Sequence, residues 1–315
     1  MAFTTEQKAY FALAATSIIW GTTWVANKIA VAQVPGLQIS YLRQFFAGIL
    51  FIIYFKLKGE PWPSFRQLKP LLFISFFLII LNSGLSTWSL GYIPAGLGAL
   101  IGAMAPVCMV LLEMILYKSR NTLFTYVGLL VGFAGISMVF YENAFSNHNK
   151  GYIFGLFLGV AAMIAWSAGC VLVSRKKIRI NPYYGLGWQM LMGAPFIYLF
   201  SLATGNHIPV NSIPFTSWAA IIYLIFIGSI IAFACFMYST KHLPMSISSL
   251  YAYFNPIIAI IVGALLLKEK LTINILTGSA ITLVGVYLVN YSMREKIHKQ
   301  IVFKRHRKKE ASLTI

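Results

Sequence analysis

A few charged side chains interrupt the long apolar runs of this chain, and they are its first candidates for chemistry. Glu113 is the only carboxylate well inside such a run, whereas Lys28 and Arg43 lie nearer the ends of theirs. A charge at the centre of a bilayer costs about 2.5 to 3.5 kcal/mol on insertion scales, so it is retained mainly when it is paired or functional. Arg43 suits a substrate carboxylate or a structural bond to a backbone carbonyl. Lys28 suits extension toward the membrane surface.

Glu113 is a candidate for energy coupling. Its helical spacing continues a face that is expected to look toward the other half of the chain, formed by Gly98, Gly102, Ala105 and Met109. Burial favours the neutral form of a carboxyl, which would let Glu113 take and release protons as access alternates. The alternative is an ion pair with a basic residue near the end of the same helix, such as Lys118 or Arg120.

Aromatic and amide side chains at mid-helix positions are candidates for a solute cavity. Trp20 and Trp166 lie on stripes of small residues toward the middle of their helices, whereas tryptophans of the lipid interface lie near helix ends. They suit cavity walls or ordinary core packing. Polar groups in hydrocarbon need partners, which adds the polar face before residue 90 to the set. The expected cavity residues are Trp20, Thr23, Asn27, Arg43, Asn82, Ser86, Trp88, Trp166, Gln189, Tyr253 and Asn255.

Two prolines interrupt apolar runs at equivalent places. Pro106 and Pro256 each remove a backbone hydrogen bond and leave a carbonyl without its donor. A membrane protein tolerates this where a neighbouring helix or cavity water donates a hydrogen bond to that carbonyl. Each proline alone is consistent with a structural kink. Because both occur at equivalent repeat positions, the pair is a candidate hinge.

The composition predicts that membrane-spanning helices position these residues. With 59% hydrophobic residues, 10% charged residues and a mean hydropathy of +0.77, the chain is expected to be an all-α integral membrane protein. About 20 apolar residues cross the hydrocarbon core as a helix. On that scale ten spans are predicted, at 9–31, 37–56, 69–90, 94–117, 122–141, 151–174, 183–204, 215–238, 244–267 and 271–291.

The second half of the chain repeats the first. Residues 88 to 141 match residues 238 to 291 at an offset of 150, as in Pro106 with Pro256 and Lys118 with Lys268. Further upstream the offset is 146, which aligns Trp20 with Trp166. The predicted units are two five-helix repeats at 1–142 and 150–292, followed by a basic tail at 293–315. An odd number of crossings per repeat predicts that the second repeat is inverted.

Positive charges predict the orientation. Lys and Arg near span ends favour the cytoplasm. With the N-terminus inside, most of the 25 basic residues face the cytoplasm, and only Lys28, Arg43, Lys150, Lys268 and Lys270 do not. Both termini are therefore expected in the cytoplasm. The basic tail is interpreted as a topology signal on an anionic leaflet, so the net charge of +18 requires no nucleic acid.

Other functional classes lack their signatures. Cys108, Cys170 and Cys235 lie within predicted spans at unrelated positions, which argues against a disulfide framework or a metal site. The chain has no phosphate-binding loop of a nucleotide-driven pump. It also has no Asp, and no set of side chains that forms a catalytic centre. Neither an enzyme nor a cofactor is expected.

The residues resemble a known family. The sequences WGTTWVANK, YLRQFFAG and LLLKEKLT, together with mid-helix prolines in the fourth and ninth spans, are similar to the EamA family of the drug/metabolite transporter superfamily. One departure is Ser119, which stands where the second repeat has Glu269. The resemblance implies a carrier for amino acids, other small metabolites or drugs in a bacterial inner membrane.

The expected function is a secondary transporter that exports small metabolites such as amino acids by alternating access. Nucleotide sugars and lipid-linked molecules are alternative substrates, and a channel is the alternative mechanism. The expected partners are a small-molecule substrate and the lipid bilayer. The sequence determines neither the substrate, the direction of flux, the coupling ion nor the oligomeric state.

Overall fold

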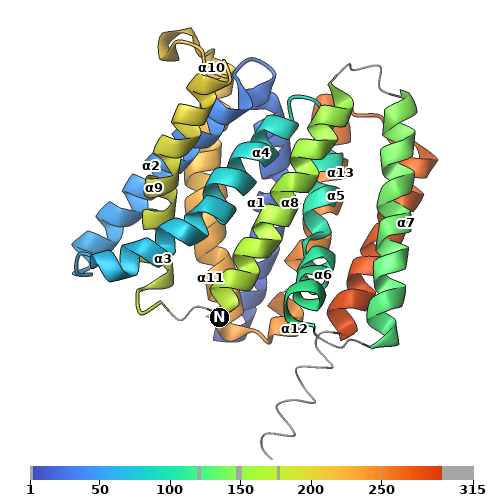
Figure 1. Ribbon diagram of the computed structural model, residues 1–315, viewed down its shortest axis with the longest axis horizontal. Coiled ribbons are helices and arrows are strands. Elements are labelled where there is room, and N and C mark those ends of the chain that lie inside the picture. The colour runs from blue at the N-terminus through green and yellow to red at the C-terminus, as the bar shows by residue number, and fades with distance from the viewer. Residues whose placement is uncertain (1–2, 119–121, 147–150, 176–177, 249, 293–315) are drawn as a thin grey trace, which may run out of the picture.

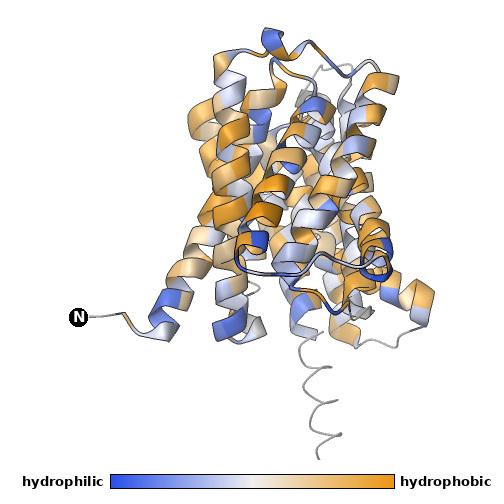
Figure 2. Cartoon of the chain, turned by 90° about the vertical axis from the view of Figure 1, so that its left-hand side faces the viewer, coloured by the Kyte–Doolittle hydropathy of each residue, from blue (hydrophilic) through white to orange (hydrophobic). Residues whose placement is uncertain are grey.

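The computed structural model describes residues 3–118, 122–146, 151–175, 178–248 and 250–292. These residues form an all-helical bundle in which apolar helices lie side by side, with more polar residues near their ends (Figures 1 and 2). By length and composition, nine of the described helices suit a membrane span, and a shorter apolar helix completes the ten predicted. The prediction of an all-α membrane fold is confirmed.

The first half contributes five spans. α1 and α2 are single helices, and the third span is continuous through a π-helical segment, η1. The bounds are α1 Thr5–Val31, α2 Gly36–Leu57, α3 Phe65–Ser75, η1 Phe76–Leu81, α4 Asn82–Ser89, α5 Ala95–Ala103, α6 Ala105–Tyr117 and α7 Leu123–Ser146. Each helix begins or ends within a few residues of its predicted boundary.

The second half has the same order. Its eighth crossing contains a π-helix, η3, and a short 3-10 turn, η2, precedes that crossing. The bounds are α8 Tyr152–Arg175, α9 Pro182–Ala203, η2 Val210–Ser212, α10 Phe215–Tyr223, η3 Leu224–Ile231, α11 Ala232–His242, α12 Met245–Ser248, α13 Tyr251–Leu267 and a last helix Ile273–Ser292.

Two spans predicted as continuous are divided. The fourth breaks at Met104, two residues before Pro106, because a proline has no N–H to continue the helix. The ninth divides between α12 and α13, whereas Pro256 lies inside α13. The structure thus places a break beside Pro106 but not beside Pro256. Their action as a hinge pair stays a prediction.

The repeat extends to rare backbone conformations. The described residues with positive φ are Gly59 (87°), Lys118 (48°), Gly205 (67°) and Lys268 (55°). Gly59 and Gly205 are separated by the upstream offset of 146, and the two lysines by the downstream offset of 150. Positive φ is uncommon in non-glycine residues, so its recurrence at equivalent lysines supports a common fold of the two halves. Their inverted relationship stays an interpretation, which the five spans of each half support.

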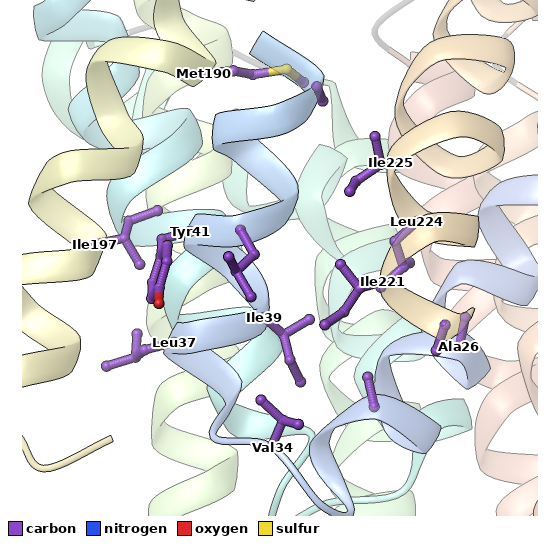
Figure 3. Packing of buried hydrophobic residues seen from close by; sticks show 14 of the residues in the cluster. Ala26, Val34, Leu37, Ile39, Tyr41, Met190, Ile197, Ile221, Leu224 and Ile225 are labelled. Carbon is purple, nitrogen blue, oxygen red and sulfur yellow. The ribbon is translucent and has the colours of Figure 1, made fainter. Parts of the chain in front are cut away.

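The largest apolar core lies around α2. In Figure 3, Leu37 and Tyr41 of α2 lie beside Ile197 of α9, while Ile39 lies toward Ile221 of α10. The helices α2 and α9 approach so closely at Gly48 that a Cβ there would lie 2.7 Å from the backbone nitrogen of Leu191. Small residues permit such contacts where lipid gives apolar side chains little reason to associate.

The first helix of each half packs mainly against helices of the other half. α1 packs against α11 and α13 of the second half, whereas α8 packs against α4 and α6 of the first. α5 packs mainly against α1 and α13 and also contacts α8, which joins the two groups. The N-terminus and α12 lie at one end of the bundle, which we call the N-terminal end; α10 lies at the other, which we call the far end (Figure 1).

Candidate functional site

The π-helix η3 lies against α1 and α2 and brings several expected cavity residues together. A π-helical turn is wider than an α-helical turn, and such segments frequently mark functional sites. In the sequence this segment reads LIFIGSII, an apolar run interrupted by Gly228 and Ser229. These two residues make the contacts that define the site.

Trp20 and Thr23 of α1 meet Gly228. The indole Nε1 of Trp20 donates a hydrogen bond to the Gly228 carbonyl at 3.3 Å. Its ring also packs within an aromatic cluster, with centroid distances of 5.1 to 5.2 Å to Phe233, Phe236 and Tyr251. Trp20 is therefore firmly oriented by protein contacts. A Cβ on Gly228 would lie 2.8 Å from the Thr23 methyl, so this close approach requires glycine.

Arg43 of α2 meets Ser229. Its Nε donates to Ser229 Oγ at 3.0 Å, and that hydroxyl donates onward to the Leu224 carbonyl at 3.0 Å. The Arg43 side chain is surrounded by protein and only partly accessible. A guanidinium has five N–H donors. Among the described residues, no acceptor is bound to the other four.

The chain places few carboxylates where they could neutralise Arg43. It has seven acidic residues, all of them Glu, and of these only Glu113 lies well inside a predicted span. No acidic side chain contributes to the electrostatic environment of Arg43 among the described residues. An unpaired guanidinium at this depth is expensive, and its planar donor geometry matches a carboxylate or phosphate. The site can therefore bind an anionic group.

Orphaned amide oxygens lie along α1 and α13. The Asn27 side chain donates to the Thr23 carbonyl at 2.8 Å, which places it one helical turn from the Gly228 contact. Its Oδ1 atom and that of Asn255 are buried and accept no hydrogen bond from the residues that the structure describes. Gly21 lets the backbone of Asn255 approach α1. Buried acceptors without donors cost free energy, so these oxygens suit a ligand N–H.

The equivalent region around η1 is mostly apolar. Gly169 of α8 contacts Leu78, and Gly193 of α9 contacts Ile79. Asn82 donates to the Leu78 carbonyl at 3.3 Å, the position equivalent to the Gly228 carbonyl. Gln189, equivalent to Arg43, is buried, and its Oε1 has no described partner.

Trp166, equivalent to Trp20, differs in its polar contacts. It is half-buried in α8, and no described residue accepts a hydrogen bond from its indole N–H. Trp20, by contrast, has its N–H bonded to the protein. Among the two tryptophans, Trp166 is thus the one whose indole N–H is open to a ligand.

Three expected cavity residues make other contacts. Trp88 packs its ring against Phe154 and Phe200. Tyr253 accepts a hydrogen bond from Asn290 of the last helix at 2.5 Å. Ser86 donates to a carbonyl of its own helix, that of Ser83, at 3.4 Å. The structure does not bring these side chains to η3.

Glu113 lies in α6, apart from η3. It is half-buried, and no described residue donates a hydrogen bond to its carboxylate. The expected alternative, a pair with Lys118, is not formed among the described atoms. Arg120, the other expected partner, lies outside the described residues, as does the predicted basic tail at 293–315.

Sequence reasoning missed Gly228 and Ser229. The signal was present as a glycine and a serine within an otherwise apolar span, but their importance depends on the π-helical turn that points them at α1 and α2.

The described residues contain no group of three metal-ligating side chains, and the three cysteines are unpaired.

The fold and the site together define a multi-span membrane protein with polar groups gathered between its helices. The model of the EamA-like transporter family matches residues 7–141 and 153–291, and the chain belongs to this family. It is thus a membrane transporter of the EamA type and not an enzyme. The two matched regions correspond to the two repeats recognised in the sequence.

Relatives carry the same description. The uncharacterized inner membrane transporter YedA of Escherichia coli (strain K12) is 29% identical over 263 residues, which covers 83% of each chain. The uncharacterized transporter YoaV of Bacillus subtilis (strain 168) is 22% identical over 295 residues, covering 92% of this chain and 99% of YoaV. A solved structure described as "Crystal structure of protein" matches with a TM-score of 0.62 at 18% identity, over 91% of this chain and 98% of that one, which supports the fold alone.

Proposed function

We propose that this transporter moves small carboxylate-bearing metabolites, amino acids first among them, out of the cell by alternating access. The observation that carries the proposal is Arg43, a guanidinium deep in the bundle that donates to Ser229 and to no carboxylate among the described residues. A substrate carboxylate supplies the missing negative charge with bidentate geometry. The Arg43–Ser229 pair is then the anion-binding end of the site.

The amide oxygens of Asn27 and Asn255 form the opposite end in this proposal. Both are buried without a described donor, and an ammonium group carries three donors and no acceptor. A zwitterionic amino acid satisfies both ends at once, whereas an amine or a carboxylic acid satisfies one. The indole N–H of Trp166 adds a donor from the other half of the chain.

Alternating access follows from the exchanged helices. The group formed by α1, α11 and α13 and the group formed by α4, α6 and α8 each combine helices of both halves. Rocking of one group against the other would expose a site between them to each side in turn. The break at Met104 lets α5 stay with α1 and α13 while α6 stays with α8. This motion supports a carrier over a channel.

The orientation proposed from the charge distribution places both termini in the cytoplasm of a bacterial inner membrane. Single cysteines in the segment 143–150 should then react with an impermeant reagent added outside intact cells. Those in the segment 175–179 should react only after the membrane is opened. The reverse labelling pattern would contradict the orientation.

Counterflow in liposomes tests the function. Liposomes that contain the purified protein are loaded with an unlabelled amino acid. Labelled amino acids, nucleobases and sugars are then added outside, one at a time. For each amino acid that exchanges, the matching amino acid amide and the decarboxylated amine serve as matched competitors. Saturable exchange that the acid inhibits and the amide does not inhibit is the expected result.

Three outcomes would reject all or part of the proposal. Equal competition by acid and amide would remove Arg43 from carboxylate recognition. Linear, non-saturable flux would indicate a channel. Exchange restricted to sugars linked to nucleotides or lipids would leave the carrier intact but replace its substrate class.

A further inference from the structure

Lys28, which is expected from the sequence to extend toward the membrane surface, binds backbone carbonyls at the far end of the bundle. Its Nζ donates to the carbonyls of Leu90 at 2.6 Å and Ile93 at 2.9 Å. These carbonyls lie just after the end of α4, in the short connection to α5 at the far end of the bundle (Figure 1). The cation of α1 is thereby bound to the C-terminal end of α4, which belongs to the other helix group.

Glu269 binds the same hairpin from the other side. Its two carboxylate oxygens accept hydrogen bonds from the backbone N–H groups of Ala95, at 2.6 Å, and Gly96, at 3.2 Å. The left-handed conformation of Lys268, the residue that ends α13, turns the chain so that Glu269 N–H bonds back to the Gly263 carbonyl. This cap directs the carboxylate at α5.

Each charge complements one helix end. The last carbonyls of a helix carry partial negative charge and its first N–H groups carry partial positive charge. Lys28 lies at the C-terminal end of α4, and Glu269 at the N-terminal end of α5. The hairpin therefore lies between two opposite charges, each bound to its favourable end. Charge-assisted hydrogen bonds of this kind are stronger than neutral ones.

The Lys28 contact joins the two helix groups at the far end. Lys28 belongs to α1 and its acceptors follow α4, whereas Glu269 follows α13 and binds the start of α5, which packs against α13. Behind them lies a cavity of about 330 Å³, lined by residues that include Leu97, Ser279 and Lys270. Because this space is not filled by side chains, the connection after α4 can move away from Lys28, while α5 stays packed against α13 at Gly96 and Ile260.

The equivalent place in the other repeat lacks both charges. The offsets align Lys28 with Ser174, whose hydroxyl donates to the Val171 carbonyl of its own helix. Glu269 aligns with Ser119, which lies outside the described residues. The left-handed cap recurs at Lys118, but no carboxylate follows it. The repeated backbone thus carries this charged connection in one repeat only.

We propose that Lys28 and Glu269 form a clasp that closes the transport path at the far end. Glu269 holds the start of α5 on α13, Lys28 holds the end of α4, and the path opens there when Lys28 releases α4. The inference rests on the alternating-access function proposed above. The asymmetry of the two repeats then biases the resting transporter toward the state that is closed at this end. Substrate leaves or enters at this end only after the clasp has opened.

Accessibility of a buried cysteine tests the clasp without any substrate. Ser279→Cys is introduced into a variant that lacks Cys108, Cys170 and Cys235, and the protein is placed in lipid nanodiscs, which expose both faces. Ser279 is buried and lines the cavity behind the clasp. We expect Lys28→Met and Glu269→Ala each to raise the maleimide labelling rate about tenfold, since hydrogen bonds to charged groups contribute about that factor. Glu269→Gln, which keeps one acceptor oxygen, should lie between these variants and the parent.

Lys270→Met is the matched control, because Lys270 lines the same cavity but is not bonded to the hairpin among the described contacts. Its labelling rate should equal that of the parent. Equal rates in the parent, Lys28→Met and both Glu269 variants would overturn the proposal. Because labelling needs no transported molecule, failure of the clasp and failure of the proposed substrate class are distinguished.

A charge exchange tests the role of the helix ends. In the double variant Lys28→Glu with Glu269→Lys, the attraction between the two opposite charges would be kept, but each charge would face the wrong end of a helix. We expect labelling to stay as fast as in the single variants. Labelling as slow as in the parent would overturn the assignment of each charge to its own helix end.

Discussion

The π-helices η3 and η1 occupy equivalent places in the two halves but present opposite chemistry. Both end at equivalent residues, Ile231 and Leu81, at the offset of 150. At η3 a threonine meets a glycine, Thr23 against Gly228; at η1 a glycine, Gly169, meets Leu78. The sizes of the contacting residues are thus exchanged between the halves.

The polar contacts differ in the same way. The Gly228 carbonyl is bonded by Trp20 of another helix, whereas the equivalent Leu78 carbonyl is bonded by Asn82 of its own span. Next to these, Ser229 bonds Arg43, while Ile79 contacts Gly193. Both repeats therefore contain the π-helix and its helix packing. The charged binding chemistry belongs to η3 alone. A substrate should contact the two halves unequally.

Arg43→Gln would give η3 the side chain that η1 has at Gln189, and it carries the largest expected effect. Loss of the charged hydrogen bonds to a substrate carboxylate should lower the exchange rate about 10- to 100-fold at subsaturating substrate. Counterflow in liposomes measures it. The control is Arg66→Gln, which removes an exposed arginine at the start of the third span. Exchange unchanged by Arg43→Gln would place recognition elsewhere.

Glu113→Gln tests a carboxylate that the first half alone carries, because the equivalent residue of the second half is Gly263. If Glu113 carries the coupled proton, the variant should lose flux driven by a proton gradient and keep substrate exchange without a gradient, because exchange needs no net proton transfer. Both fluxes are measured on the same liposome preparation. Retention of gradient-driven flux would eliminate Glu113 as the coupling group.

Much of this architecture was predictable from the sequence. Ten apolar runs and the two offsets predicted the spans and the repeat, because bilayer thickness determines helix length and a repeated pattern implies a repeated fold. The local interruptions were not predictable to the same degree. Pro106 and Pro256 look equivalent in sequence, yet only the first adjoins a break.

The candidate site was predicted less completely. Trp20, Thr23 and Arg43 were expected from their positions in the spans, and the structure brings all three to η3. Trp88 and Tyr253 were expected for the same reasons but pack elsewhere. Composition and spacing indicate that a polar residue needs a partner, but which partner it meets depends on the rotation of each helix and on the extra width of a π-helical turn.

Gly228→Leu would place an η1 side chain in η3, and its effect should be intermediate. The added side chain meets the Thr23 methyl, and overpacking of this kind typically costs about 1 to 3 kcal/mol. A lower melting temperature of the purified protein is expected. Combining it with Thr23→Gly reproduces the Gly169–Leu78 arrangement and should recover most of the melting temperature. No recovery in the double variant would show that the two contacts are not interchangeable.

The smallest effects are expected from the two tryptophans, and they should differ in kind. Trp20→Phe removes the hydrogen bond to the Gly228 carbonyl, which should cost about 1 kcal/mol of stability, because a buried acceptor loses its donor. Trp166→Phe removes an N–H that no described residue binds, so stability should stay the same. If that N–H binds substrate, the KM for exchange should rise several-fold, since a lost hydrogen bond of about 1 kcal/mol corresponds to roughly a fivefold weaker affinity. Measuring melting temperature and KM on both variants separates a residue that holds the site together from one that contacts the solute. An unchanged KM in Trp166→Phe would assign both tryptophans to packing and leave substrate recognition to the polar side of η3.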